Sequence, residues 1–205
     1  MRYPSFRIVV FCKAPEPGQV KTRLASSVGE AEACRVHEAL ATRMISEAVA
    51  SNLAPVELWC SPSTDHPFFE RFDVPRYLQQ GADLGERMHC AIDGASGRAD
   101  AVVLVGTDCP PIDRDYLDLA LSSLESADAV LGPAEDGGYG LIGLRRPRLS
   151  LFRDMAWSTA SVAAITVERF EQASLRYCCL PTIWDVDRPE DLRRWRELSR
   201  PARDC

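Results

Sequence analysis

Short apolar runs alternate along the chain with longer segments of helical periodicity, and this alternation limits the fold more than any other feature. The clearest run, Ala101–Val105, ends at Gly-Thr-Asp-Cys-Pro-Pro. Further strands are expected over 6–12, 56–60, 76–79, 129–131, 140–144 and 176–180, and helices over 29–51, 83–92, 113–125, 158–173 and 189–198. This alternation is typical of a mostly parallel sheet with helices on both faces. We expect a three-layer α/β/α sandwich in a single domain spanning residues 1–205.

Composition narrows the class of protein. The 24 basic and 30 acidic residues give a net charge of −6, which argues against nucleic acid as a partner because such proteins present a basic face. No stretch approaches the roughly 20 apolar residues of a membrane span, and no signal peptide is recognisable. The eight cysteines are scattered without C-x-x-C spacing, so reduced structural thiols are expected, with zinc or redox roles as the alternatives. We expect a cytoplasmic protein, as a monomer or homodimer.

Both lysines of the chain, Lys13 and Lys21, fall in the loop after the first expected strand, whereas every other basic residue is arginine. Pro17 and Gly18 shape a turn in this loop, and Arg23 follows. Cationic side chains with backbone N–H groups at a strand-to-helix junction can cradle phosphate. The spacing fits neither a Walker P-loop nor a Rossmann fingerprint. A solvated, positively charged loop is the alternative interpretation.

Two aspartates are candidate metal ligands. Asp108 follows the strand over 101–105, at the carboxyl end where α/β sheets bind ligands, and its oxygens suit Mg²⁺ or Mn²⁺. Asp187 has the spacing of an N-cap in a capping box with Glu190, which leaves Asp185 without a structural role. We therefore expect Asp185 to be the second metal-binding carboxylate. The alternatives are a turn-initiating aspartate at 108 and a solvated loop acid at 185.

Two further features are weaker. The acidic, glycine-rich segment 132–140 joins two expected strands; its glycines let a backbone approach a ligand closely, although Asp-Gly also simply makes hairpin turns. The histidines His37, His66 and His89 show no metal spacing. We expect His37 to be a surface or hydrogen-bonded histidine rather than a base. The absence of G-x-S-x-G argues against a serine hydrolase.

The chain carries five segments that belong together: FCKAPEPGQVKTRL (11–24), QGADLGERM (80–88), GTDCP (106–110), GPAEDGGY (132–139) and DVDRPEDL (185–192). In order and spacing they resemble one family of small glycosyltransferase-A-like proteins, related to phospholactate guanylyltransferase and the molybdopterin nucleotidyltransferases. Some members are described as arsenosugar-biosynthesis glycosyltransferases. The resemblance covers the chain from about residue 6 to residue 198, and the first and fourth segments are the most specific.

The resemblance implies a nucleotide-diphospho-sugar transferase (GT-A) fold, with the nucleotide across the carboxyl edge of the sheet. It implies nucleotide or phosphate binding by Lys13, Pro17, Gly18, Lys21, Thr22, Arg23, Gln80, Gly81, Asp83, Arg87 and Thr107. It further implies catalytic roles for Lys21, Asp108 and Asp136, acceptor binding by Gly137, Gly138 and Tyr139, and a metal on Asp108 and Asp185. One departure matters: Thr-Asp-Cys-Pro is not a D-x-D motif, so the second carboxylate must come from elsewhere in the chain.

Three functions follow from this reading. The favoured one is a metal-dependent transferase that uses a nucleotide-activated sugar, a small-molecule acceptor and Mg²⁺ or Mn²⁺. The alternative is a nucleotidyltransferase in which a phosphate-bearing small molecule attacks the α-phosphate of an NTP and pyrophosphate leaves. The third is a non-catalytic nucleotide-binding module.

Overall fold

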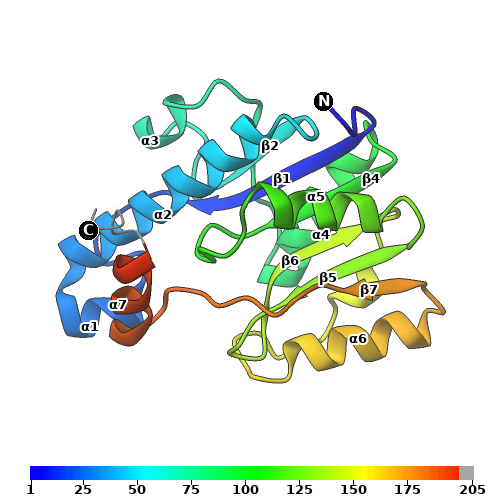
Figure 1. The fold of residues 1–205 in the computed structure, drawn as a ribbon. Helices are drawn as coiled ribbons and strands as arrows, with labels where there is room; N and C mark the ends of the chain where they lie inside the picture. The colour runs from blue at the N-terminus through cyan, green and yellow to red at the C-terminus, as the bar shows by residue number, and fades with distance from the viewer. Residues whose placement is uncertain (199–205) are drawn as a thin grey trace, which may run out of the picture.

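A seven-stranded sheet forms the centre of the protein in the computed structural model, which describes residues 1–198 (Figure 1). The strand order is β3-β2-β1-β4-β6-β5-β7, and only β6 runs antiparallel to its neighbours. The strands are β1 (Phe6–Lys13), β2 (Val56–Ser61), β3 (Arg76–Leu78), β4 (Ala101–Val105), β5 (Ala129–Pro133), β6 (Tyr139–Leu144) and β7 (Tyr177–Cys179). The carboxyl ends of six strands and the amino end of β6 therefore meet at one edge.

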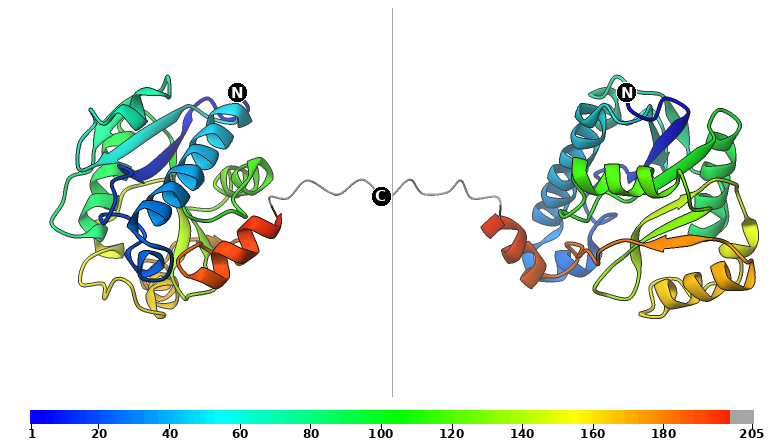
Figure 2. Two further views of the ribbon diagram at one scale, coloured as in Figure 1. Left: turned by 90° about the vertical axis from the view of Figure 1, so that its left-hand side faces the viewer. Right: turned by 45° about the vertical axis from the view of Figure 1, so that its right-hand side comes forward.

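Helices cover both faces of this sheet, as Figure 2 shows from two sides. One face is covered by α2 (Glu30–Ser51) and α5 (Arg114–Ser123), the other by α4 (Leu84–Ser96) and α6 (Val162–Gln172). The expected three-layer sandwich is confirmed. Every residue of β4 is buried, because both of its faces are covered; this is why its sequence is continuously apolar instead of alternating.

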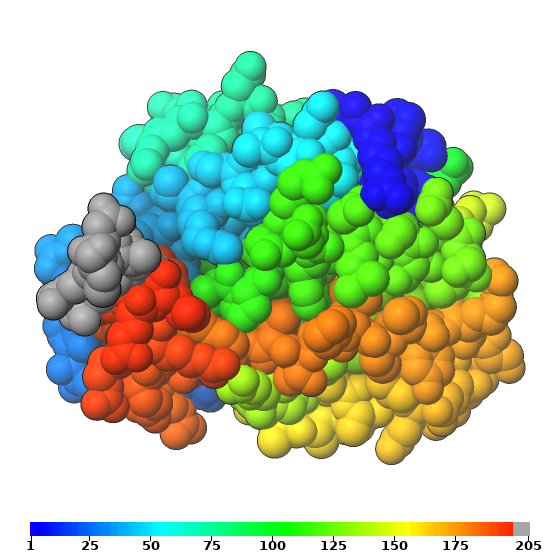
Figure 3. All heavy atoms as spheres, in the orientation of Figure 1, coloured from blue at the N-terminus to red at the C-terminus, as the bar shows by residue number. Residues whose placement is uncertain are grey.

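A separate apolar cluster closes one end of the molecule. Leu24 of α1 (Thr22–Val28), Leu40 of α2 and Leu192 of α7 (Pro189–Leu198) pack together with Trp184 and Val186. The chain reaches this cluster from β7, and Figure 3 shows it (orange) lying between α5 (green) and α6 (yellow) before α7 (red). The packing holds the segment around residue 185 next to the loop that follows β1.

Some local predictions from the sequence need correction. The chain is helical over α1, where a loop up to residue 29 was expected. Helix α6 begins at Val162 instead of residue 158, because Ser158 has a left-handed φ of 64° that cannot continue a helix. Two short elements, α3 (Pro67–Glu70) and η1 (Leu149–Leu151), were not predicted, since one turn is too short to show periodicity.

Most of the cysteines lie in the sheet and the helices. The cysteines within residues 1–198 are free, while Cys205 lies outside the described residues. Burial raises the pKa of Cys60 to about 12 and also raises that of Cys12. Both thiols are therefore neutral and act as small hydrophobic groups in the sheet. No helix in this range is long and apolar enough to cross a membrane.

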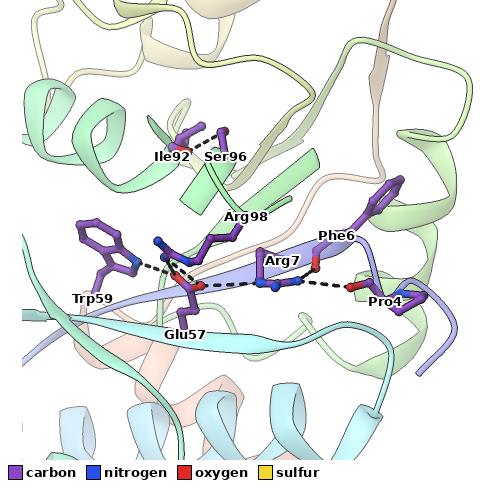
Figure 4. Close-up of polar contacts among 8 residues, drawn as sticks. All are labelled: Pro4, Phe6, Arg7, Glu57, Trp59, Ile92, Ser96 and Arg98. Carbon is purple, nitrogen blue, oxygen red and sulfur yellow. Dashed lines mark hydrogen bonds and ion pairs between the residues drawn. The ribbon is translucent and has the colours of Figure 1, made fainter. Parts of the chain in front are cut away.

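A buried carboxylate lies away from the sheet edge described above, near the amino end of β1 (Figure 4). Glu57 of β2 is 3% exposed. Arg98 donates to both of its oxygens at 3.0 Å, Arg7 Nε lies 3.6 Å away, and Trp59 Nε1 donates at 3.4 Å. Each oxygen of this carboxylate is thus satisfied by protein donors, as buried charge requires. The arrangement fastens β1, β2 and the end of α4 together.

Candidate active site

Three cavities open along the edge where the strand ends meet. We name one by its size and two by the side chains that line them. They are the large cavity of about 650 Å³, the cation cavity of about 280 Å³ and the aromatic cavity of about 270 Å³. Asp108, just beyond β4, lines all three. Its position at the end of the most completely buried strand makes it the fixed point of the site.

An ion pair between Lys21 and Asp108 forms the centre of the site. Lys21 Nζ lies 3.1 Å from Asp108 Oδ2, although the residues are 87 positions apart. The lysine side chain is 7% exposed, whereas that of the aspartate is 41% exposed because it opens into the cavities. Burial alone would lower the pKa of Lys21, but Asp108, Asp185 and Asp187 together raise it. The Lys21 charge in turn lowers the pKa of Asp108, so both groups are ionised at neutral pH.

The backbone at Lys21 is strained. Its φ of 49° and ψ of 45° are left-handed, which costs a non-glycine residue about 1–2 kcal/mol. The strained residue is also the one whose ammonium group reaches Asp108. Strain of this kind persists only where the surrounding structure fixes it, and it clusters at functional sites.

Asp185 lies close to this ion pair. The N–H of Val186 donates to the backbone carbonyl of Asp108 at 2.9 Å, which fixes the chain after β7 against the end of β4. Burial first, and then the negative charges of Asp108 and Asp136, raise the pKa of Asp185 to about 6. This corner of the site therefore holds more negative charge than its protein cations offset.

The excess negative charge fits a divalent cation. Within residues 1–198 no group of three or more His, Cys, Asp or Glu side chains is arranged to hold a metal ion. Asp108 and Asp185 would thus contribute only two carboxylates. Such sparse protein ligation is the usual arrangement for Mg²⁺, which keeps several waters and takes substrate phosphate oxygens as further ligands.

The cation cavity contains the predicted phosphate-binding residues of the β1 loop. It is lined by Lys13, Gln19, Val20, Lys21, Thr22, Arg23, His37, Asp108 and Asp187. Pro17 and Gly18 are not among the lining residues; Gly18 has a φ of 76° and serves the turn. Lys13 Nζ donates to the carbonyl of Gln19 at 2.7 Å, which ties the two ends of the loop together.

The prediction that Asp187 caps the last helix is wrong. Helix α7 begins at Pro189, and Asp191 instead accepts from the backbone N–H groups of Asp187 and Arg188 at 3.1 and 2.8 Å. The Asp187 side chain is therefore free of the helix end, and it pairs with Arg23 at 2.9 Å. Both carboxylates of the DVD sequence consequently lie beside the cationic loop.

His37 is a site residue that sequence reasoning set aside. It is 7% exposed, so it is not a surface residue. Its Nε2 lies 2.8 Å from the carbonyl of Lys13, which can only accept, so Nε2 carries the proton. Burial lowers the pKa of His37, and the ring is neutral at pH 7. It lines both the large and the cation cavities, and no local pattern in α2 distinguishes it from the other buried positions.

The large cavity takes part of the predicted 80–87 segment. Arg87 and Leu84 of this segment line it together with the predicted Thr107. Phe11 and Gln79 also line it and were not predicted. Gln79 Nε2 donates to the backbone carbonyls of Trp59 at 2.8 Å and Cys12 at 3.4 Å, which leaves its Oε1 to accept.

Three predicted residues of the same segment, Gln80, Gly81 and Asp83, are not among the lining residues. Asp83 instead caps α4 by accepting from Glu86 N–H at 2.8 Å. A Cβ at Gly81 would lie 2.6 Å from the backbone nitrogen of Arg87, so this position requires glycine for packing.

The aromatic cavity contains the predicted acceptor-binding segment. Asp136, Gly138 and Tyr139 line it, and Asp136 Oδ1 accepts from Gly138 N–H at 2.8 Å. Gly137 does not; a Cβ there would collide with Ala160, so it lets two loops pack together. The lining also includes Trp157, Ser158 and Thr159, which were not predicted as site residues. The sequence placed Trp157 in a loop and the other two at the start of the helix expected over 158–173.

Comparison with known proteins identifies the family and the fold of the chain. The family model described as "Uncharacterized protein conserved in bacteria (DUF2064)" matches residues 44–159, more than half of the chain. The chain belongs to this family. No curated protein matches it. Among solved structures, a candidate nucleotide-diphospho-sugar transferase from Desulfovibrio desulfuricans G20 is 34% identical, with a TM-score of 0.89 over 97% of this chain and 89% of that one.

More distant structures share the fold of this DUF2064 protein. CMP:2-keto-3-deoxy-manno-octonic acid synthetase complexed with CTP is 12% identical, with a TM-score of 0.63 over 95% of this chain and 98% of that one. The inositol-1-phosphate CTP transferase from T. maritima is 13% identical, with a TM-score of 0.57 over 99% of both chains. The nucleotide-diphospho-sugar transferase fold implied by the sequence resemblance is confirmed.

Proposed function

We propose that this protein is a metal-dependent transferase that takes a nucleotide-activated sugar as donor and a small molecule as acceptor. The observation that carries the proposal is the position of Asp108, which lines all three cavities and pairs with Lys21. The 34% identical Desulfovibrio protein, described as a nucleotide-diphospho-sugar transferase candidate, supports the same class of donor.

The three cavities suit three parts of such a reaction. The nucleoside fits the large cavity, where Gln79 Oε1 can accept from a base N–H. The diphosphate fits the cation cavity, where Lys13, Lys21 and Arg23 stabilise the charge that develops on the leaving group. The acceptor fits the aromatic cavity, where Asp136 orients its hydroxyl group.

Asp108 and Asp185 would hold the divalent cation. When bound, Mg²⁺ or Mn²⁺ supplies Lewis-acid neutralisation of the diphosphate oxygens. The role of Lys21 is to place its ammonium group beside the same diphosphate oxygens. Its left-handed backbone and its contact with Asp108 hold it there. The role of Asp187 is to position the Arg23 guanidinium through their 2.9 Å contact.

A nucleotidyltransferase is the second candidate. The observation in its favour is the set of three cationic side chains, Lys13, Lys21 and Arg23, in one cavity, since a triphosphate carries more charge to neutralise than a diphosphate. In that reaction the acceptor attacks the α-phosphorus of an NTP and pyrophosphate leaves through the cation cavity.

The experiment measures binding and product release together. The purified protein is incubated with each NTP and with UDP-, GDP-, ADP- and dTDP-sugars, with and without Mg²⁺ or Mn²⁺, and each mixture is supplied with small hydroxyl-bearing and phosphate-bearing acceptors. A ligand at about 100 times its Kd should stabilise the fold by about 2.7 kcal/mol. Stabilisation by a nucleotide sugar with nucleoside diphosphate release supports the proposal, whereas stabilisation by an NTP alone with pyrophosphate release supports the second candidate.

A matched pair of variants locates the binding. Lys21→Gln should abolish the nucleotide-induced shift in melting temperature. Arg2→Gln breaks the ion pair between Arg2 and Asp118, which lies outside the three cavities. This control should leave the shift unchanged. Equal shifts in both variants would remove the cation cavity from the proposal, and binding without any product release would indicate the non-catalytic module.

A further inference from the structure

The charge of the aromatic cavity differs from that of the cation cavity next to it. Three carboxylates line the aromatic cavity, those of Asp108, Asp136 and Asp185, and its lining contains no lysine or arginine. Cations close to this lining are bonded within the protein: Lys21 to Asp108, Arg23 to Asp187, and Arg169, whose charge acts on Tyr139, to the carbonyls of Leu151 and Arg153. A divalent cation on Asp108 and Asp185 would offset those two charges but not that of Asp136. An anion entering this cavity beside Asp136 would therefore meet a like charge, and such a pair at short range is costly where water is scarce.

The other wall of the cavity is apolar and aromatic. The rings of Tyr139 and Trp157 meet edge to face, with centroids 6.4 Å apart and an interplanar angle of 79°. Leu84, Met88 and Val162 extend this wall. Such a surface packs against the C–H face of a ring or a carbon chain.

The polar groups around this wall are matched to hydroxyl groups. Asp136 uses Oδ1 on its own loop and keeps Oδ2 to accept, while Ser158 and Thr159 add hydroxyl oxygens. Trp157 Nε1 is buried and has no hydrogen-bond partner among residues 1–198. A buried donor without a partner is uncommon in a native structure. Because this nitrogen atom is shielded from the cavity, the indole offers an acceptor its ring surface and not its N–H.

We propose that the molecule bound in the aromatic cavity is a hydroxyl-bearing acceptor without phosphate or carboxylate groups, packed against Tyr139 and Trp157. The inference rests on the proposed function and specifies its second substrate. The acceptor oxygen forms a bond to the anomeric carbon of the donor, the bond from that carbon to the diphosphate oxygen breaks, and the nucleoside diphosphate leaves. The hydroxyl proton passes to Asp136 and then to water. The carboxylate of Asp136 disfavours a phosphate-bearing acceptor, such as the one in the nucleotidyltransferase reaction.

The test uses matched pairs of probes that differ only in a phosphate group: myo-inositol and inositol 1-phosphate, glycerol and glycerol 3-phosphate, ribose and ribose 5-phosphate. Each is titrated calorimetrically, at millimolar concentration, into protein saturated with the nucleotide selected above and Mg²⁺. We expect at least one unphosphorylated probe to bind, about ten-fold or more tighter than its phosphate. Equal or tighter binding of the phosphates, or no binding by any unphosphorylated probe, overturns the inference.

Variants then place the binding in this cavity. Trp157→Ala should weaken binding of the preferred probe at least ten-fold while nucleotide affinity stays within two-fold; Trp157→Phe keeps the ring and serves if the alanine variant does not fold. Tyr177→Phe is the aromatic control outside the cavity. Asp136→Asn should narrow the difference between a probe and its phosphate, whereas the neighbouring Glu135→Gln, which only breaks the pair with Arg194, should not. Unchanged discrimination in Asp136→Asn counts against the inference.

The two proposals fail in different ways. Nucleotide binding is measured before any probe is added, so the absence of nucleotide stabilisation would reject the proposed function itself. Nucleotide stabilisation with preferential binding of the phosphorylated probes would leave the nucleotide site intact and reject only the acceptor class.

Discussion

Two carboxylates, Glu57 within β2 and Asp108 just beyond β4, differ in what their negative charge does. That of Glu57 stabilises the fold, whereas that of Asp108 is available for chemistry. The side chain of Glu57 is 4% exposed and accepts from Arg98 and Trp59, with Arg7 close by. Asp108 receives one lysine, is 41% exposed, and opens into three cavities with Asp185 close by. The first carboxylate has all its partners within the protein, and the second leaves bonding capacity for molecules from outside.

The largest expected effect is on the open carboxylate. Asp108→Asn keeps the shape of the side chain but removes its charge, and turnover should fall by about 10³-fold, or about 4 kcal/mol of barrier. Steady-state product release measures the loss, and the melting temperature reports whether the fold is intact. Asp113→Asn, at the cap of α5, is a control whose turnover should match the parent. Normal turnover in Asp108→Asn would mean that the site lies elsewhere.

The closed carboxylate should show the reverse behaviour. Glu57→Gln leaves Arg98 and Arg7 without their charged partner, and the free energy of unfolding should fall by roughly 3 kcal/mol. Urea unfolding measures this loss, while turnover of the folded protein stays unchanged. Glu135→Gln breaks an exposed pair and should cost under about 0.5 kcal/mol. A Glu57 variant that loses turnover without losing stability would contradict the comparison.

Removing the charge of Asp185 should stabilise the folded protein at neutral pH. Its pKa is raised from 3.8 to about 6, so its contribution to stability is full below about pH 4 and is lost as the pH rises through 6. Asp185→Asn should thus be more stable than the parent by at most about 3 kcal/mol at pH 7 to 8, less the part that solvent screens, and should match the parent near pH 3.5.

Melting curves over this pH range check the prediction for Asp185. Added Mg²⁺ should raise the melting temperature of the parent at pH 7.5 and leave that of Asp185→Asn unchanged. If Asp185→Asn is less stable than the parent at pH 8, the charge of Asp185 does not destabilise the folded protein. If the variant still responds to Mg²⁺, Asp185 is not a ligand of the cation.

The smallest expected effect concerns Arg23. Its side chain is 61% exposed, so water and salt screen its charge. Arg23→Ala should weaken nucleotide binding about three- to ten-fold at low salt, and less at high salt, in a calorimetric titration. Arg2→Ala is the matched control. An effect larger than that of Lys21→Gln would reverse the assigned ranking of the two cations.

The sequence allowed the sheet and the edge that carries the site to be predicted. The strand over 101–105 has the predicted bounds, and α7 spans the predicted residues 189–198. Where prediction failed, the controlling contacts were not local. Asp187 had the spacing of a helix cap, yet a partner 164 positions away takes its side chain. Gly81 lay in a segment assigned to the nucleoside, yet it serves the packing of its own loop.

The sequence by itself determined the buried strands β4 and β5, because burial on both faces of a sheet demands continuous apolar runs. It also determined that Asp108 follows β4. Only the tertiary structure decided that Lys21 reaches this carboxylate, that His37 is buried, and that Trp157 packs edge to face against Tyr139 in the wall of an acidic cavity. The reason is physical: parallel strands bring their carboxyl ends to one edge whatever lies beyond them, but which loops meet there depends on the packing of helices far apart in the chain.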